Sequence, residues 1–159
     1  MKKVIILLLS ICTGFASMAQ SSDELAMLRE MFGKEKKDII SEFLKLSETD
    51  GAKFWPLYDE YSAKRKALGD YRSKIIKDYA NQYTNLTNDQ AKNLGDRLFK
   101  NESDIIKLQQ KYYSKMSKAV SPLKATQFMQ TELYLQTQLR AEIQDEIPFI
   151  GELDKTKKN

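Results

Sequence analysis

The chain of 159 residues is 42% hydrophobic and 30% charged, and it carries a formal net charge of +4. This small positive excess disfavours nucleic-acid binding, and the absence of histidine removes the commonest general base near neutral pH. Six glycines and three prolines provide few interruptions, which favours long helices.

Residues 1–19 have the pattern of a secretory signal peptide. Lys2 and Lys3 form a charged start, an apolar run follows through Ile11, and Ser17-Met18-Ala19 is a small-x-small cleavage site. The apolar run is too short to span a bilayer, and no later stretch is continuously apolar over that length. We therefore expect export to the periplasm and a mature chain without a transmembrane segment.

The only cysteine, Cys12, lies inside this leader. A lipid-modified cysteine usually follows a small residue, whereas Ile11 precedes this one, so lipoprotein anchoring through Cys12 is disfavoured. The mature chain would then have no disulfide and no thiol chemistry, with 24 basic residues against 22 acidic ones once Lys2 and Lys3 are removed.

The first helix is expected to open at Ser22, where acidic residues follow, and to end near Lys45. Gly33 interrupts its apolar pattern, so a bend or a break is expected there. The apolar residues at helical spacing are Leu25, Leu28, Phe32, Ile39, Phe43 and Leu46.

The second helix is expected to start at a Ser47 cap and to run to Tyr83. Its apolar seam recurs every seven residues, at Phe54, Tyr61, Leu68 and Ile75. Pro56 either kinks this helix or moves its start to near Trp55.

Thr87 is expected to cap a third helix that ends near Ala119, and Ser121-Pro122 to open a fourth that runs to Pro148. Their seams are Leu94, Leu98, Ile105, Leu108, Tyr112 and Met116 in the third helix, and Phe128, Leu135, Leu139 and Ile143 in the fourth. Short links between long helices favour antiparallel neighbours. The prediction is an all-α fold, with four long helices in an antiparallel hairpin or open bundle over residues 20–150. A disordered basic tail over residues 151–159 completes it.

One short motif recurs at the predicted corners. It is complete at Leu86-Thr87-Asn88-Asp89-Gln90, and looser copies lie at Leu46 to Asp50 and at Val120 to Lys124. In each copy a hydroxyl side chain can accept hydrogen bonds from the first free N–H groups of the following helix.

This pentapeptide resembles the LTxxQ motif of the Spy/CpxP family, which are periplasmic helical proteins of envelope stress. The segments Phe54 to Tyr58 and Ala125 to Phe128 resemble parts of other secreted members. The resemblance implies a four-helix hairpin that dimerises into a curved cradle. It implies roles such as ATP-independent chaperone, modulator of a sensor kinase, or sensor of heavy metals. Leu86, Thr87 and Gln90 are carried over as structural residues at a helix junction, and the looser copies end in Asp50 and Lys124 where the family has Gln.

Candidate contact residues for a polypeptide are aromatic and basic. Tyr61 and Tyr112 are expected to fill the seam between helices, whereas Tyr58, Tyr83 and Tyr113 are open between core and binding surface. A lysine stripe at i, i+4 and i+7 is first of all a solvated face, although it would also attract acidic client segments. That stripe consists of Lys111, Lys115 and Lys118.

The leading hypothesis is an exported, non-enzymatic protein that binds unfolded or partner polypeptides, as an ATP-independent chaperone or an envelope-stress adaptor. The alternative is a regulatory or sensory protein that docks on one membrane partner. A metal-responsive sensor is the third hypothesis, because the resemblance implies metal-sensing relatives and Met27 and Met31 have i, i+4 spacing. The absence of histidine disfavours it, and methionine serves more often in packing. A homodimer is compatible with each. We expect no catalytic residue, no metal ligand and no cofactor.

Overall fold

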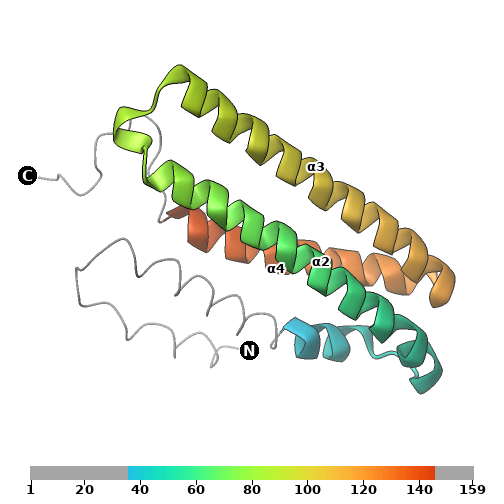
Figure 1. The fold of residues 1–159 in the computed structure, drawn as a ribbon. Helices are drawn as coiled ribbons and strands as arrows, with labels where there is room; N and C mark the ends of the chain where they lie inside the picture. The colour runs from blue at the N-terminus through green and yellow to red at the C-terminus, as the bar shows by residue number, and fades with distance from the viewer. Residues whose placement is uncertain (1–35, 146–159) are drawn as a thin grey trace, which may run out of the picture.

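The computed structural model describes residues 36–145, and every regular element in that range is helical (Figure 1). The elements are a helix over residues 36–44, α2 (Glu48–Ala80), the short 3-10 helix η2 (Tyr83–Asn85), α3 (Asn88–Ala119) and α4 (Pro122–Asp145). The predicted all-α fold with four helices is confirmed. The predicted leader (1–19), the first part of the first helix and the predicted tail (151–159) lie outside the described residues.

The long helices pack as antiparallel neighbours. α2 lies beside α3, and α3 lies beside α4, to which it is joined by the sharp corner at Val120 and Ser121 (Figure 1). The 36–44 helix packs at the end of the bundle near this corner, where it contacts both α2 and α4. In the part of the chain described here, no helix is both long and apolar enough to cross a bilayer.

Hydroxyl side chains start the helices as predicted. The Ser47 hydroxyl accepts a hydrogen bond from the N–H of Asp50 at 3.1 Å, and the Ser121 hydroxyl accepts one from the N–H of Lys124 at 3.2 Å. Each satisfies one of the N–H groups that a helix start leaves free. The alternative start of α2 near Trp55 is therefore wrong.

Two further predictions for α2 need correction or refinement. Pro56 lies inside the helix, which runs on both sides of it, and Phe54 in the preceding turn is fully buried. Packing thus holds the turn in which proline removes a backbone donor. α2 ends at Ala80 rather than at Tyr83, because the chain turns at residues 81–82 and forms η2 before it reaches Thr87.

Aromatic rings form the centre of the core. The Phe128 ring of α4 lies 5.4 Å from that of Phe54, 5.9 Å from that of Tyr58 and 5.5 Å from that of Tyr61, edge to face in each case. The rings of Tyr61 and Tyr112 lie 5.6 Å apart, which confirms that these two fill the seam between α2 and α3. The buried cluster consists of Ile40, Leu44, Phe54, Tyr58, Tyr61, Tyr112, Met116, Ala125 and Phe128.

The buried side of the 36–44 helix differs from the prediction. Ile40 and Leu44 are fully buried, whereas the expected seam residues Ile39 and Phe43 are exposed. Both pairs have i, i+4 spacing, so periodicity alone does not distinguish them. The rotation of the helix is set by its partners, since Lys36 reaches the buried Glu132 of α4.

Candidate functional site

The predicted contact residue Tyr58 belongs to the core. Only 2% of it is exposed, and its ring lies among Phe54, Trp55 and Phe128. Burial, with a smaller contribution from the negative charge of Glu132, raises the pKa of Tyr58 to about 12. Tyr58 is therefore wrong as a surface candidate, because packing covers its ring.

The other two tyrosines lie at opposite ends of α3. Tyr83 is half-buried in η2, where its ring lies 6.1 Å from that of Tyr79. Tyr113 is exposed near the far end of α3, and its hydroxyl lies 3.4 Å from that of Thr126 on α4. A helix of this length separates them, so they do not belong to one contact surface.

The predicted lysine stripe is divided by the fold. Lys115 turns towards α2, where its Nζ lies 3.4 Å from a carboxylate oxygen of Glu60 and 5.0 Å from the ring centroid of Tyr112. A hydrogen bond from the Tyr112 hydroxyl and the nearby Lys115 together lower the pKa of Glu60. Lys111 and Lys118 remain exposed, so only two of the three lysines face solvent freely.

The LTxxQ segment forms a complete capping box at the start of α3. The N–H of Gln90 donates to the Thr87 hydroxyl at 3.3 Å, and the N–H of Thr87 donates to the Gln90 side-chain oxygen at 2.9 Å. Two orphan donors are thereby satisfied by two neighbouring side chains. Thr87 and Gln90 thus act at a helix junction, and Leu86 is the half-buried residue that precedes the cap.

The departures from the motif have structural consequences of their own. Lys124 stands where the family has Gln, and its Nζ donates to the backbone oxygen of Leu44 at 2.6 Å. A cation there satisfies a free carbonyl at the end of the 36–44 helix and complements its dipole. The side chain thus links two helices, where Gln would close a capping box within one.

The sequence reading missed an uncharged surface on α4. Between Lys124 and Arg140 the only charged residue is Glu132, which is fully buried. Leu123 is 68% exposed, Tyr134 63% and Leu133 52%. The exposed residues of α4 in this stretch are otherwise Thr and Gln, namely Thr126, Gln130, Thr137 and Gln138.

An apolar edge of α3 adjoins this surface. Phe99, Ile106 and Tyr113 are exposed by 75%, 52% and 39%, and they recur every seven residues, so they lie on one side of α3. The Tyr113–Thr126 contact and the Glu102–Arg140 ion pair fix the antiparallel register of α3 and α4. In that register Ile106 lies level with Leu133. We call these α3 residues and the exposed α4 residues named above the uncharged face, which consists of Phe99, Ile106, Tyr113, Leu123, Thr126, Gln130, Leu133, Tyr134, Thr137 and Gln138.

The two exposed lysines of the predicted stripe, Lys111 and Lys118, lie on another side of α3. Lys111 follows Ile106 by five positions, as Lys118 follows Tyr113, and five residues correspond to about 140° around a helix. Lys111 and Lys118 are therefore separate from the apolar edge formed by Phe99, Ile106 and Tyr113. The sequence contains the signal for the uncharged face. It consists of the charge-poor residues 125–139 and of the seven-residue spacing of Phe99, Ile106 and Tyr113.

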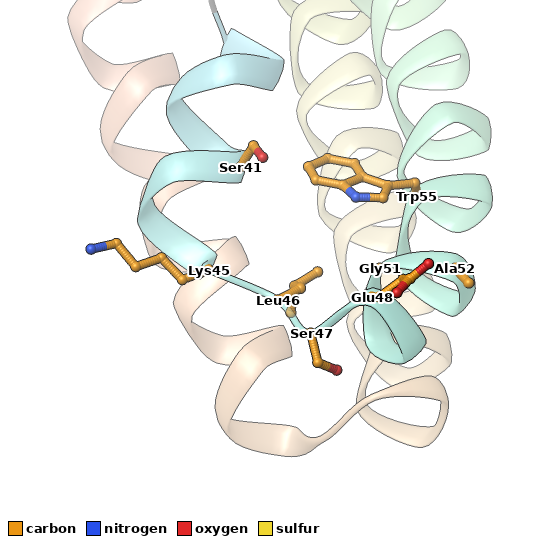
Figure 2. A pocket seen from close by; sticks show the side chains of 8 residues that line it. All are labelled: Ser41, Lys45, Leu46, Ser47, Glu48, Gly51, Ala52 and Trp55. Atoms are coloured by element: carbon orange, nitrogen blue, oxygen red, sulfur yellow. The ribbon is translucent and has the colours of Figure 1, made fainter.

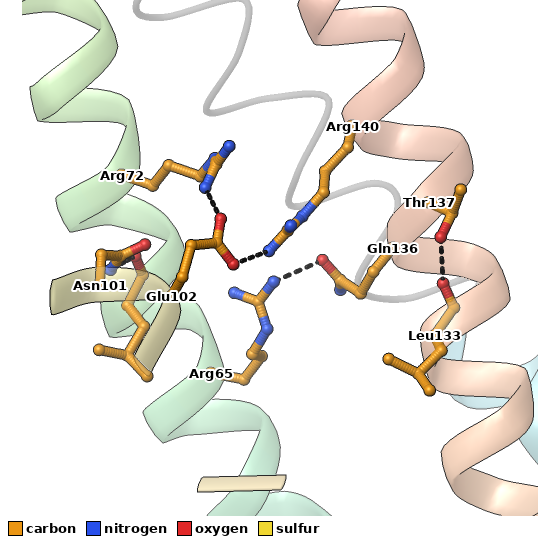
Figure 3. Close-up of polar contacts among 9 residues, drawn as sticks. Arg65, Arg72, Asn101, Glu102, Leu133, Gln136, Thr137 and Arg140 are labelled. Atoms are coloured by element: carbon orange, nitrogen blue, oxygen red, sulfur yellow. Dashed lines mark hydrogen bonds and ion pairs between the residues drawn. The ribbon is translucent and has the colours of Figure 1, made fainter. Parts of the chain in front are cut away.

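A buried polar layer joins α2, α4 and the 36–44 helix. Glu132 accepts a hydrogen bond from the Tyr61 hydroxyl at 2.9 Å, and its other oxygen lies 2.5 Å from Lys36 Nζ. Arg65 donates to the side-chain oxygen of Gln136 at 2.7 Å (Figure 3). Burial lowers the pKa of Arg65 and raises that of Tyr61, as expected for polar groups inside a core.

Glu102 of α3 is the centre of the next contact along the bundle. Arg72 of α2 and Arg140 of α4 reach its two carboxylate oxygens from opposite sides (Figure 3). Burial alone would raise the pKa of Glu102, but the guanidinium groups of Arg140 and Arg72 hold it below its ordinary value. One carboxylate thus ties all three helices together.

An open cleft of about 610 Å³ lies between the 36–44 helix and the first turns of α2 (Figure 2). The Trp55 ring projects into it towards Ser41, with Leu46 at its base and the side chain of Lys45 turned outward (Figure 2). Over residues 36–145 there is no group of three or more histidine, cysteine, aspartate or glutamate residues that could hold a metal ion. Met27 and Met31 lie outside the described residues.

Comparison of the chain with protein-family models, with curated proteins and with solved structures finds no match.

Proposed function

We propose that this protein is an exported, non-enzymatic protein that binds other polypeptides. The observation that carries the proposal is the uncharged face, on which Leu, Ile, Phe and Tyr side chains remain exposed on a chain that is 30% charged. Exposed apolar area with few charges is typical of surfaces that bind proteins. Export rests on the leader pattern of residues 1–19.

The chemistry of the face suits polypeptide segments. Leu133, Ile106 and Phe99 offer apolar contact to side chains that an unfolded segment exposes. The amides of Gln130 and Gln138 provide donors and acceptors, which match the N–H and C=O groups of a polypeptide backbone. The hydroxyls of Thr126 and Thr137 donate to backbone oxygens of α4 and offer acceptors. The absence of exposed charge between Lys124 and Arg140 predicts binding that depends little on salt.

The first candidate role is that of an ATP-independent chaperone, as the resemblance to the Spy/CpxP group implies. Apolar contacts spread along two helices favour reversible holding of many segments. The test is light scattering by a denatured model protein in the presence of the mature chain. Suppressed aggregation supports this role, and no suppression at stoichiometric excess counts against it.

Matched variants separate the face from the rest of the surface. The double variant Ile106→Glu with Leu133→Glu places two charges on the uncharged face at positions that are about half exposed, so folding is retained. We expect it to lose the suppression of aggregation. The control Lys111→Glu with Lys118→Glu changes charge on another side of α3, and we expect it to behave like the wild type.

The second candidate role is docking on one membrane partner as a regulator. The mixture of Thr, Gln and Tyr side chains on two helices favours it, because such a face can select a partner by hydrogen bonding. A pull-down from envelope extract separates the roles. One dominant partner that is lost in the Ile106→Glu, Leu133→Glu variant supports docking, and many unfolded species support the chaperone.

A further inference from the structure

We propose that the 36–44 helix can be exchanged between two copies of this chain, so that each copy completes the core of the other. The surface concerned is the end of the bundle where α2 and α4 meet, and its partner is the same helix of a second copy. This proposal does not rest on the uncharged face or on the function proposed for it.

The polar contacts that the described 36–44 helix makes with other helices go to α2 and α4, and a second copy offers the same residues. Ile40 and Leu44 enter the aromatic cluster, and Lys36 pairs with the buried Glu132. Lys37 lies 2.7 Å from a carboxylate oxygen of Asp59 and over the Trp55 ring. Ile40 and Leu44 are fully buried and Lys36 is nearly so, so docking on α2 and α4 covers one side of this helix.

The link between this helix and α2 consists only of residues 45–47. Lys45 is, among the described residues other than glycine, the one with a positive φ, at 43°. Side chains with a Cβ atom disfavour this left-handed conformation, for which glycine is the usual residue. The closed chain therefore holds a strained residue at its hinge.

The surroundings of the link leave room for movement. The cleft beside it is open, and the side chain of Lys45 points outward (Figure 2). A change at Lys45 from the left-handed to the extended conformation would direct the 36–44 helix away from its own α2. Short strained hinges of this kind favour exchange of a terminal element between copies.

Matched substitutions at Lys45 test the proposal in opposite directions. Lys45→Gly removes the strain from the closed form and should weaken the dimer, whereas the β-branched and polar Lys45→Thr increases the strain and should strengthen it. Because a dimer contains two links, we expect its dissociation constant to rise roughly 30- to 1,000-fold for Lys45→Gly relative to the wild type. Sedimentation equilibrium over a series of protein concentrations measures it.

A mixing experiment tests whether the helix itself crosses between copies. Lys36→Glu and Glu132→Lys each place like charges together within one chain. When the two variants are mixed, exchange brings Glu at position 36 of one copy against Lys at position 132 of the other and retains the wild-type pair at the second site. We expect native mass spectrometry to show a heterodimer that is more stable than the homodimer of either variant.

Three results would overturn the proposal. One is a dissociation constant that is the same for the wild type, Lys45→Gly and Lys45→Thr. Another is the absence of any dimer of Lys45→Thr at the highest protein concentration. Because Lys45 is exposed, this test stays valid even if Lys36→Glu or Glu132→Lys fails to fold. A third is a dimer whose dissociation constant is unchanged by substitutions at Lys45 but which dissociates in the Leu133→Glu variant. That result would assign dimerisation to the uncharged face.

Discussion

The strongest prediction for stability concerns Phe128, the ring on which three aromatic side chains of α2 converge. Its side chain is fully buried and makes edge-to-face contacts with Phe54, Tyr58 and Tyr61 of α2. The substitution Phe128→Ala removes the ring and leaves a cavity between α2, α4 and the 36–44 helix. We expect the free energy of unfolding to fall by about 4 kcal/mol.

The magnitude follows from burial and from the aromatic contacts. Loss of a buried Phe ring costs about 3–5 kcal/mol, and each edge-to-face pair contributes about 0.5–1.5 kcal/mol of that loss beyond its buried area. Phe54, Tyr58 and Tyr61 are held on one rigid helix, so the cavity closes poorly. In a chain of this size about 4 kcal/mol corresponds to a fall in Tm of roughly 8–16 °C.

Urea unfolding followed by circular dichroism measures the effect. The control is Tyr134→Ala, which removes a ring of similar size from the exposed side of the same helix. This control should change the free energy of unfolding by no more than about 0.5 kcal/mol. A loss below about 1 kcal/mol for Phe128→Ala, or equal losses for the two variants, would refute the assignment of the aromatic cluster as the core.

Three further predictions concern the cap and the titrating groups. Thr87→Ala should cost about 1 kcal/mol of unfolding free energy in urea titrations, because Gln90 loses its partner in the capping box, and Thr87→Ser should retain most of it. The buried Tyr58 keeps its proton to about pH 12, whereas the unfolded chain ionises near pH 10. The contribution of this difference to the free energy of unfolding is therefore fully present below pH 10, and about 2–3 kcal/mol of it is lost as the pH rises to 12. Tyr58→Phe should flatten this decline in urea midpoints measured against pH. The lowered pKa of Glu102 affects stability at acid pH. Its contribution to the free energy of unfolding is present above about pH 4.5 and is lost as the pH falls below that value. Glu102→Gln should weaken that acid dependence, and an unchanged acid limb would contradict the three-helix contact.

The helix starts could be predicted because capping is local. Ser47, Thr87 and Ser121 each bond to an N–H three residues further along, so the necessary partners lie within one turn of sequence. The seam of α2 and α3 was predictable for a similar reason, since Tyr61 and Tyr112 belong to periodic patterns that continue over many turns.

Predictions that depended on the choice between equivalent positions went wrong. Ile39 and Phe43 have the same spacing as Ile40 and Leu44, and only contacts with α2 and α4 decide which pair is buried. Tyr58 gave no local signal that α4 would cover it with Phe128.

The candidate surface shows the same division. The scarcity of charge in residues 125–139 is visible in the sequence, but its position on an exposed side of α4 is not. Lys115 looks equivalent to Lys111 and Lys118 along the chain, yet Glu60 of α2 draws it away from them. Exposure and ion pairing at these positions depend on which helix lies opposite.

The sequence by itself determined that residues 36–145 are helical, where α2, α3 and α4 begin, and that the chain has no imidazole. These properties follow from residue types and from hydrogen bonds that reach no further than one turn. Only the tertiary structure decided which side of each helix is covered, how Lys124 and Glu132 join distant segments, and that the 36–44 helix is held through a strained Lys45. The physical reason is that burial and ion pairing arise between helices whose relative rotation no local pattern specifies.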